Sequence, residues 1–212
     1  MSAAQVSTTD GNLPTSGAAL PEREIMWTGI GGQGVQLAAK ILALAATGQG
    51  REVMSLGTYG GTMRGGNTDA VVVVAGGRIL SPPMVSSAWA AVVVHPRYFE
   101  PIRQKLRPGG AVFVDADLLE EPLGETAATI YPIEATRISR EVDAPKAAAL
   151  ILLGAFAHAT GIVGADALDA ALADSLPSYR HQFLEANRRA LAAGRDVTEA
   201  LIHPAWPAEG DV

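Results

Sequence analysis

A glycine-rich turn between an apolar run and a helix-forming segment is the feature that most restricts the fold of this chain. Residues 24–28 read EIMWT, and residues 29–34 read GIGGQG, which matches the pattern G-x-G-x-x-G. Residues 33–47 follow with strong helix formers and apolar residues at helical spacing, and Gly48 and Gly50 end that segment. The order of strand, glycine turn and helix predicts the start of an α/β sheet.

Further short apolar runs predict the other strands of the sheet. They lie at residues 52–56, 68–75, 90–94 and 111–114. The valine-rich run at 68–75 is apolar enough for a strand that is buried on both faces. Residues 129–131 are a weaker candidate for an edge strand.

Two shorter predictions concern the segments between these strands. Gly76 and Gly77 favour a tight hairpin turn into a strand at 78–80. Residues 98–106 favour a helix, and the Pro-Gly-Gly turn at 108–110 then leads into the next strand.

The second half of the chain predicts helices. Their ranges are 133–142, 146–160, 166–175 and 178–193, with Gly161 and Gly194 as stop signals. The whole pattern predicts a Rossmann-like, doubly wound α/β fold with a mainly parallel sheet, helices on both faces and a C-terminal helical extension. We expect a single domain at 23–202, between a flexible N-terminal tail at 1–22 and a C-terminal tail at 203–212.

The helix at 146–160 has almost no polar face. A helix that is apolar all round must be covered on every side. It is therefore either buried in its own domain or covered by another subunit.

The composition excludes several classes of function. The 212 residues contain no cysteine, so this chain forms no disulfide and holds no cysteine-ligated zinc ion or iron–sulfur cluster. Its four histidines are scattered without metal-ligand spacing, so no metal site is predicted. The net charge of −6 disfavours nucleic acid as a partner. No apolar run is long enough to cross a bilayer, and residues 1–21 lack the apolar core of a secretory signal, so we expect no membrane partner and a cytoplasmic location.

The glycine turn at 29–34 suits a bound anion. Glycines allow a tight turn and a close approach of the backbone, and the amides at the start of the helix favour negative charge. An NAD site also needs an acidic residue at the end of the second strand, to hold the ribose hydroxyls. That end reads Leu56-Gly57-Thr58, so the sequence disfavours an ordinary NAD-dependent dehydrogenase.

A second glycine cluster, YGGTMRGGN at 59–67, follows the second strand. In an open α/β sheet we expect both glycine loops at the carboxyl ends of neighbouring strands. Arg64 could pair with a phosphate or carboxylate through two parallel hydrogen bonds. It could equally anchor a partner subunit, with the glycines allowing close backbone contact. Both alternatives make the loop a contact surface.

Two aspartates, Asp115 and Asp117, follow the predicted strand at 111–114. Ligands often bind at such a strand end. Helix capping or loop solvation is nevertheless the more typical use of aspartate there.

The two glycine loops together resemble the gamma subunit, or gamma domain, of the 2-oxoacid:acceptor oxidoreductases. This family includes the pyruvate, 2-oxoglutarate, branched-chain (ketoisovalerate) and aryl-pyruvate (indolepyruvate) ferredoxin oxidoreductases. The segments that carry the resemblance are GIGGQGVQLAAKIL and TYGGTMRGGNTDAVVVV. It runs from about residue 24 to residue 119 and continues more loosely through LGAF at 153–156.

The resemblance implies a subunit of an enzyme complex that is not catalytic alone. Such complexes decarboxylate a 2-oxoacid oxidatively on thiamine diphosphate with Mg²⁺. Electrons pass through 4Fe-4S clusters to ferredoxin or a similar acceptor, and the acyl group usually goes to coenzyme A. These cofactors lie mostly on the alpha, beta and delta subunits, which would be the partners of this chain. The gamma part helps to assemble the complex and to shape its coenzyme A side. The isolated chain could form a homodimer.

The resemblance also carries a cofactor-binding role over to residues of both loops, with no catalytic residue among them. The first loop contributes Gly29, Gly31, Gly32, Gln33 and Gly34, and the second contributes Thr58, Tyr59, Gly60, Arg64, Gly65, Gly66 and Asn67. Many relatives have an acidic residue where this chain has Gly61-Thr62-Met63, so its specificity can differ. Two alternatives are a stand-alone enzyme that binds NAD or FAD and a non-catalytic scaffold paralogue.

Overall fold

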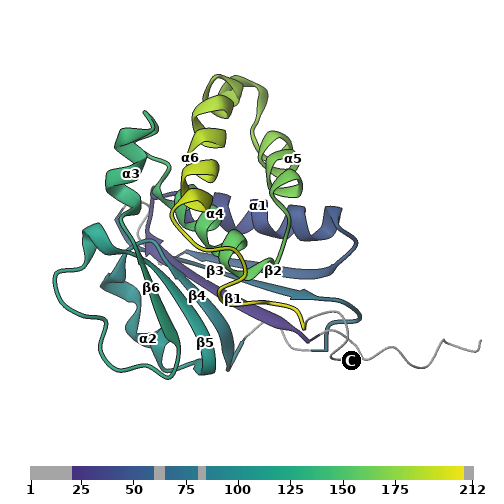
Figure 1. The fold of residues 1–212 in the computed structure, drawn as a ribbon, viewed down its shortest axis with the longest axis vertical. Helices are drawn as coiled ribbons and strands as arrows, with labels where there is room; N and C mark the ends of the chain where they lie inside the picture. The colour runs from purple at the N-terminus through teal and green to yellow at the C-terminus, as the bar shows by residue number, and fades with distance from the viewer. Residues whose placement is uncertain (1–20, 60–64, 81–84, 208–212) are drawn as a thin grey trace, which may run out of the picture.

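Six strands form one twisted sheet in the order β2-β3-β1-β4-β5-β6 (Figure 1). The computed structural model describes residues 21–59, 65–80 and 85–207. The strands are β1 (Arg23–Ile30), β2 (Glu52–Tyr59), β3 (Asn67–Ala75), β4 (Ala88–Val93), β5 (Leu106–Asp115) and β6 (Thr129–Ile133). Residues 60–64, in the second glycine loop, lie outside the described residues, as do residues 1–20 of the predicted N-terminal tail.

The sheet is mainly parallel. Strands β1, β4, β5 and β6 pair in parallel, whereas β3 pairs antiparallel with both β1 and β2. The expected class, a mainly parallel Rossmann-like α/β fold, is confirmed. The expectation that the two glycine loops follow neighbouring strands was wrong, because β3 lies between β1 and β2.

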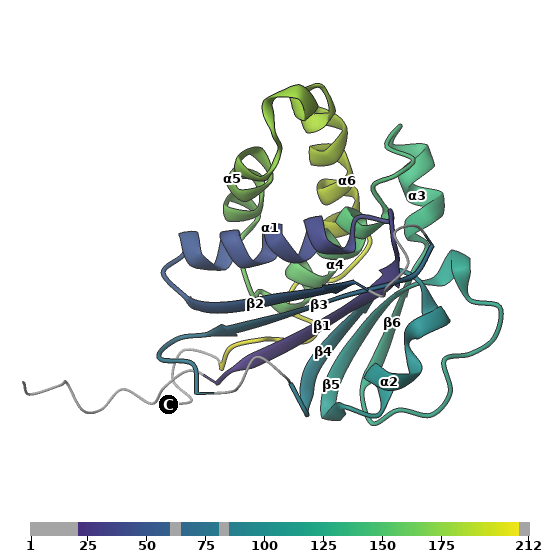
Figure 2. The same ribbon diagram turned by 180° about the vertical axis from the view of Figure 1, so that it is seen from behind.

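The helices cover the two faces of the sheet unequally. They are α1 (Val35–Gly48), α2 (Glu100–Arg103), α3 (Ala135–Glu141), α4 (Ala148–Thr160), α5 (Ala165–Ser175) and α6 (Leu184–Asp196), with three short 3-10 turns η1 (Pro96–Tyr98), η2 (Ala116–Leu118) and η3 (Ser178–Phe183). Figures 1 and 2 show α1, α4, α5 and α6 stacked on one face and the short α2 on the other. No helix in the described part of the chain combines the length and apolar character needed to span a membrane.

Helix α4 forms the centre of the larger core, between the sheet and α6. Eleven of its residues are buried. The ring of Phe156 packs edge-on against Trp27 of β1 and Phe113 of β5, with centroid distances of 6.4 and 5.4 Å. Of the two predicted ways to cover this apolar helix, burial within its own domain is therefore the correct one.

Two glycines allow α4 and α6 to cross at close range. A Cβ on Gly154 of α4 would lie 2.1 Å from the carbonyl oxygen of Leu191, and one on Gly194 of α6 would lie 2.0 Å from that of Ile151. The prediction that Gly194 ends the last helix was wrong, because α6 continues to Asp196. Gly194 is required for packing rather than for termination.

Several other helices and strands differ from their predicted ranges. Residues 78–80 form no strand; the amide of Leu80 instead donates to a carboxylate oxygen of Glu22 at 2.6 Å. The helix expected at 98–106 is divided into η1 and α2 and stops early, because Leu106 already pairs with Ala88 as part of β5. Helix α4 starts at Ala148 rather than at residue 146.

The segment after α6 returns to the start of β1. The amides of His203 and Ala205 donate to the carbonyl oxygens of Ala159 and Thr160 at the end of α4, at 2.9 and 2.7 Å. Ala205 is fully buried, and its carbonyl accepts a hydrogen bond from Arg23. The first residues of the predicted C-terminal tail therefore pack against the domain.

We predict that Gly194→Ala destabilises the protein although alanine is the better helix former. The methyl group meets the α4 backbone, and overpacking of this kind costs about 1–3 kcal/mol. The control is Gly48→Ala in α1, where a Cβ has no neighbour within 4 Å and where the gain in helix propensity is up to about 1 kcal/mol. Urea unfolding of both variants checks this, and equal stability would contradict the close crossing.

Candidate functional site

The two glycine loops meet at one end of the strands, where β1 and β2 end and β3 begins. The amide of Gly31 donates to the carbonyl oxygen of Gly66 at 2.9 Å. A Cβ on Gly31 would lie 3.6 Å from the nitrogen of Gly65. The loops are thus in direct backbone contact at the start of β3, as the site prediction requires. The predicted site residues Gly60 and Arg64 lie outside the described residues.

The first glycine loop is closed by its own hydrogen bonds. The side-chain oxygen of Gln33 accepts from the amide of Ile30 at 2.8 Å, and the amide of Gln33 donates back to the carbonyl of Ile30 at 3.1 Å. Gln33 therefore braces the turn. The amides of Ile30, Gly31 and Gln33 are already paired within the chain.

The amides at the start of α1 remain available. Those of Gly34, Val35 and Gln36 donate no hydrogen bond to any described residue, and no side chain caps this helix end. Gly32 and Gly34 have φ angles of 101° and 84°, which strongly favour glycine. Unpaired amides and the dipole of a 14-residue helix together attract an anion.

The glycines of the first loop have different roles. A Cβ on Gly29 would lie 2.7 Å from a methyl carbon of Val35 and 3.2 Å from the Cβ of Val94. Gly29 thus lets β1, α1 and the end of β4 pack together. The nearest atom to a Cβ on Gly31 is the hydroxyl oxygen of Thr68, at 3.4 Å. Gly31 has an ordinary van der Waals environment and no positive φ.

Gln36 connects the helix of the first loop to the strands of the second. Its side-chain amide donates to the backbone carbonyls of Asp69 on β3 and Thr58 on β2. A Cβ on Gly57 would collide with the Gln36 side chain, at 2.2 Å from its oxygen. The sequence interpretation did not single out Gln36, because its partners become visible only once β3 is known to lie beside β1.

An NAD-binding fold places its acidic residue at the end of the parallel strand next to β1. In this protein the strand on that side of β1 is the antiparallel β3. The residue beside Thr28 of β1 is Asp69 of β3, rather than a residue of β2. One carboxylate oxygen of Asp69 accepts from the side-chain amide of Asn67 at 2.7 Å. Asp69 sits within the strand pairing and is bonded to Asn67, so it does not supply the missing ribose-binding group at a strand end.

A groove of about 630 Å³ lies at the carboxyl ends of β4 and β5 on the face of α2. Its lining residues are His95, Pro96, Arg97, Phe99, Glu100, Leu118, Glu120, Glu121, Pro122 and Leu123. His95 accepts a hydrogen bond from the amide of Arg97 at its Nδ1 atom, and burial, with Arg97 nearby, lowers the pKa of this histidine. Three glutamates line the groove against one arginine, so it disfavours a phosphate, in contrast to the start of α1.

The two aspartates at the carboxyl end of β5, Asp115 in its last position and Asp117 two residues later, act as caps, as expected. The buried carboxylate of Asp115 accepts from the amides of Asp117 and Thr136, at 3.3 and 3.2 Å, and from the hydroxyl of Thr136 at 2.5 Å. Asp117 accepts from the amide of Arg137 at 2.6 Å. These bonds tie the end of β5 to the start of α3.

The fold and the site define the class of protein: it is a Rossmann-like α/β protein in which a second glycine loop contacts the glycine turn at the start of α1. The sequence model of the family described as "Pyruvate ferredoxin/flavodoxin oxidoreductase" matches residues 24–197. The chain belongs to this family.

Related proteins agree in length and fold. "2-oxoglutarate synthase subunit KorC" from Methanocaldococcus jannaschii is 32% identical over 182 residues, covering 84% of this chain and 95% of that protein. The gamma subunit of a keto/oxoacid ferredoxin oxidoreductase from Geobacter sulfurreducens has a similar structure, with a TM-score of 0.70, 27% identity and coverage of 82% and 96% of the two chains. A 2-oxoglutarate:ferredoxin oxidoreductase from Magnetococcus marinus has a TM-score of 0.72 at 20% identity, over 82% of this chain and 30% of that one, which concerns the fold alone.

These comparisons confirm the family resemblance and the predicted role as a gamma-type subunit of a 2-oxoacid oxidoreductase. The binding roles of the two loops remain predictions.

We predict that Gly29→Ala destabilises the protein and that Gly31→Ala does not. The methyl group at position 29 is enclosed by Val35, Gln33 and Val94, and the expected cost is about 1–3 kcal/mol. At position 31 only ordinary contacts form, so the change stays within about 0.5 kcal/mol. Thermal unfolding of the two variants checks this, and the reverse order of stability would contradict the packing role of Gly29.

We predict a pH-dependent effect of Asp115→Asn. Burial raises the pKa of Asp115 above that of the unfolded chain, so ionisation opposes folding as the pH rises from the unfolded pKa, about 3.9, through the folded one. Asparagine keeps an acceptor for the two amides and does not ionise. The variant should therefore gain stability relative to the wild-type protein as the pH rises over this range. Urea unfolding at several pH values measures the difference, and a constant difference would refute a shifted pKa at Asp115.

Proposed function

We propose that the two glycine loops of this gamma-type subunit form the surface that completes the coenzyme A side of a 2-oxoacid oxidoreductase complex. The observation that supports this is that the amides of Gly34, Val35 and Gln36 have no hydrogen-bond partner among the described residues, beside the contact between Gly31 and Gly66. This donor set suits a phosphate group. The enzyme from Magnetococcus marinus, which shares the fold, is described with coenzyme A bound, so coenzyme A is the ligand to test.

In this proposal the chain binds and orients, and other subunits carry out the chemistry. The amides at the start of α1 hold a phosphate of coenzyme A, and Gln36 fixes α1 to the strands that carry the second loop. Arg64 adds a guanidinium that pairs with the phosphate or with a partner subunit. Thiamine diphosphate, which supplies the decarboxylation chemistry with Mg²⁺, and the 4Fe-4S clusters lie on alpha, beta and delta subunits, in keeping with the absence of cysteine from this sequence.

The competing function is a stand-alone enzyme that binds NAD or FAD at the first loop. The placement of Asp69 within the strand pairing, bonded to Asn67, weighs against it. Titration of the isolated chain with NADH, FAD and coenzyme A distinguishes the two. Saturable NADH binding with turnover would favour the stand-alone enzyme. The cytoplasmic location and the homodimer of the isolated chain stay predictions from the sequence, which cell fractionation and light scattering test.

We predict that Arg64→Ala impairs the complex without unfolding the subunit. We expect the substitution to change stability by no more than about 0.5 kcal/mol, whereas the loss of a charge-assisted pair to a phosphate should raise the KM for coenzyme A about tenfold or more. Arg78→Ala is the matched control. Arg78 is exposed, and it follows β3 at the end of the strands opposite to the glycine loops.

Two measurements on the reconstituted complex separate the two roles of Arg64. Size-exclusion chromatography measures assembly, and steady-state kinetics measure the KM for coenzyme A. A raised KM with intact assembly favours phosphate binding, and lost assembly favours a partner contact. An unchanged complex with full coenzyme A-dependent activity would overturn the role of Arg64.

A further inference from the structure

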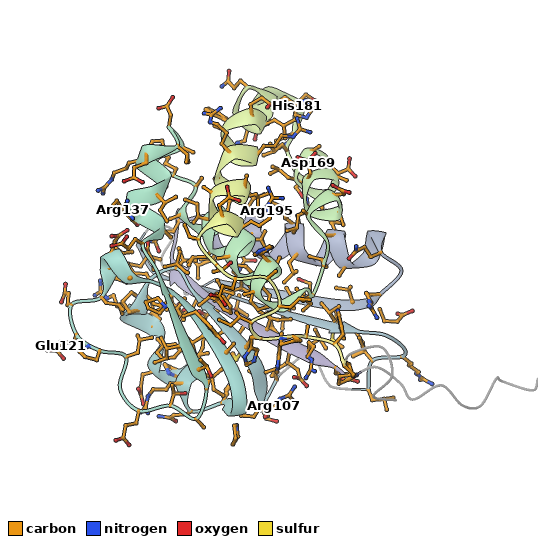
Figure 3. The ribbon with its side chains drawn as sticks, in the orientation of Figure 1. Arg107, Glu121, Arg137, Asp169, His181 and Arg195 are labelled. Atoms are coloured by element: carbon orange, nitrogen blue, oxygen red, sulfur yellow. The ribbon has the colours of Figure 1, made fainter. Side chains whose placement is uncertain are left out.

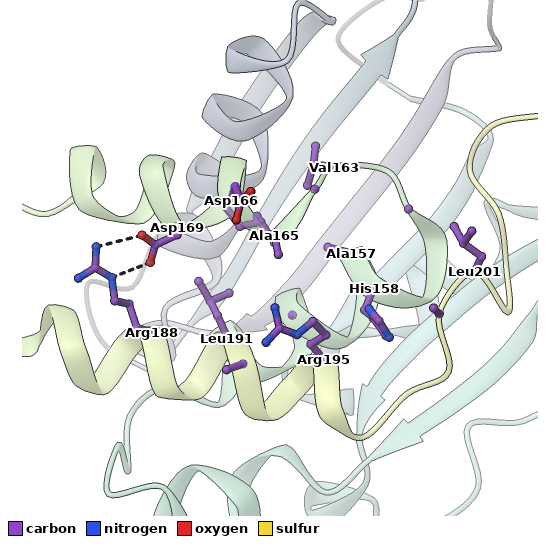
Figure 4. Close-up of a pocket in the computed structure, with 16 residues that line it drawn as sticks. Ala157, His158, Val163, Ala165, Asp166, Asp169, Arg188, Leu191, Arg195 and Leu201 are labelled. Carbon is purple, nitrogen blue, oxygen red and sulfur yellow. Dashed lines mark hydrogen bonds and ion pairs between the residues drawn. The ribbon is translucent and has the colours of Figure 1, made fainter.

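A second cavity, of about 440 Å³, lies within the helical layer. It is enclosed by α4, α5, α6 and the segments that follow α4 and α6 (Figure 4). Its size is that of a small-molecule site. Figure 3 shows Asp169 of α5 and Arg195 of α6 in this layer, above the sheet.

The cavity is distant from the glycine loops. The first turn of α4 lies beside the first loop, since a Cβ placed on Gly34 would be 3.6 Å from the Cβ of Ala149. The last turn of α4 carries Ala157 and His158, which line the cavity. Ala149 and Ala157 are eight residues apart on this helix, roughly 12 Å at 1.5 Å per residue.

The walls of the cavity are mainly apolar. They include Ala157, Val163, Leu168, Leu191 and Leu201. Leu201 is 58% exposed and forms part of the rim. Such walls bind the aliphatic part of a ligand, and a few polar groups then fix its orientation.

Two of the charged residues in the cavity already form an ion pair with each other. Arg188 of α6 donates to both carboxylate oxygens of Asp169 on α5, at 2.6 and 3.0 Å, and also to Glu185 at 2.6 Å. Figure 4 shows this ion pair at one end of the cavity. Arg188 and Asp169 hold α5 and α6 together and have little capacity left for a ligand.

Two further basic groups are available. The Nε atom of Arg195 lies 3.8 Å from the carboxylate of its chain neighbour Asp196, which is beyond hydrogen-bond range, and the ring of His158 makes no hydrogen bond to the described residues. Figure 4 shows Arg195 between Leu191 and His158. Asp166, also in the lining, stands in the first turn of α5, where the helix dipole offsets its charge.

We propose that this cavity binds a small aliphatic carboxylate. Arg195 and His158 bind the carboxylate group, and the apolar walls enclose the hydrocarbon chain. Asp166 provides a place for an ammonium group, so an aliphatic amino acid and a simple aliphatic acid are the two sources of this chemistry. The proposal does not depend on the function of the glycine loops.

The test is an NMR titration of the full-length, ¹⁵N-labelled chain with isovalerate and, separately, with leucine. We expect saturable shifts of the amides of Ala157, Gly161, Val163 and Leu191 with at least one of them, and none at Gly31. Isovaleramide, which has the same shape without the charge, should not saturate. Tighter binding of leucine or of isovalerate identifies which source the site prefers.

Variants on one helix supply the controls. Arg195→Gln should weaken binding at least roughly tenfold, whereas Arg189→Gln, which removes a cation of α6 outside the cavity lining, should leave it unchanged. Ala192→Phe should fill the cavity and abolish binding. The spectrum of each variant reports whether it is folded.

Three outcomes would overturn the proposal. They are the absence of saturable binding by both probes, an unchanged affinity in folded Arg195→Gln, and shifts confined to the glycine loops. If neither probe binds and Ala192→Phe instead blocks assembly of the complex, the cavity receives a segment of a partner subunit.

Discussion

The burial of α4 on every side is the constraint on which the rest of the structure depends. A helix without a polar face is stable only when other elements cover it completely. The sheet covers one side through the ring of Phe156, and α6 covers another at the close crossing of Gly154 and Gly194. The same helix lies beside the first glycine loop at one end, at Ala149, and lines the cavity in the helical layer at the other. Both candidate ligand sites therefore rest on one rigid element.

The antiparallel strand β3 determines what the glycine turn can bind. In a dinucleotide-binding fold a parallel strand flanks β1 on both sides, and the turn and the acidic end of one of these strands together hold the dinucleotide. Here β3 takes that position, and the loop before it contacts the turn through the bond from Gly31 to Gly66. In the described residues, the two loops meet through the backbone of Gly31, Gly65 and Gly66. Such a surface suits a phosphate or the backbone of another subunit better than it suits a complete cofactor.

The parts of this architecture that could be predicted from the sequence are those encoded locally. The strand, glycine turn and helix at the start follow from short-range patterns, and so does the left-handed end of α4 at Gly161. The capping by Asp115 was also predictable from its position after a strand. The position of β3 was not, because strand order depends on long-range pairing. Gly194 was mistaken for a stop because the sequence does not show that α4 approaches it.

The candidate site separates into residues whose roles the structure explains and residues whose roles depend on a partner. Gly29 and Gln33 are explained within the chain, since one allows close packing and the other braces the turn. The amides of Gly34 to Gln36 have no such internal explanation in the described residues. Unpaired amides at a helix start are inexpensive while water reaches them, but they become costly once another subunit excludes that water. An anion bound to the amides at the start of α1 would then stabilise the assembled complex more than the free subunit. Ligand binding and assembly are therefore linked.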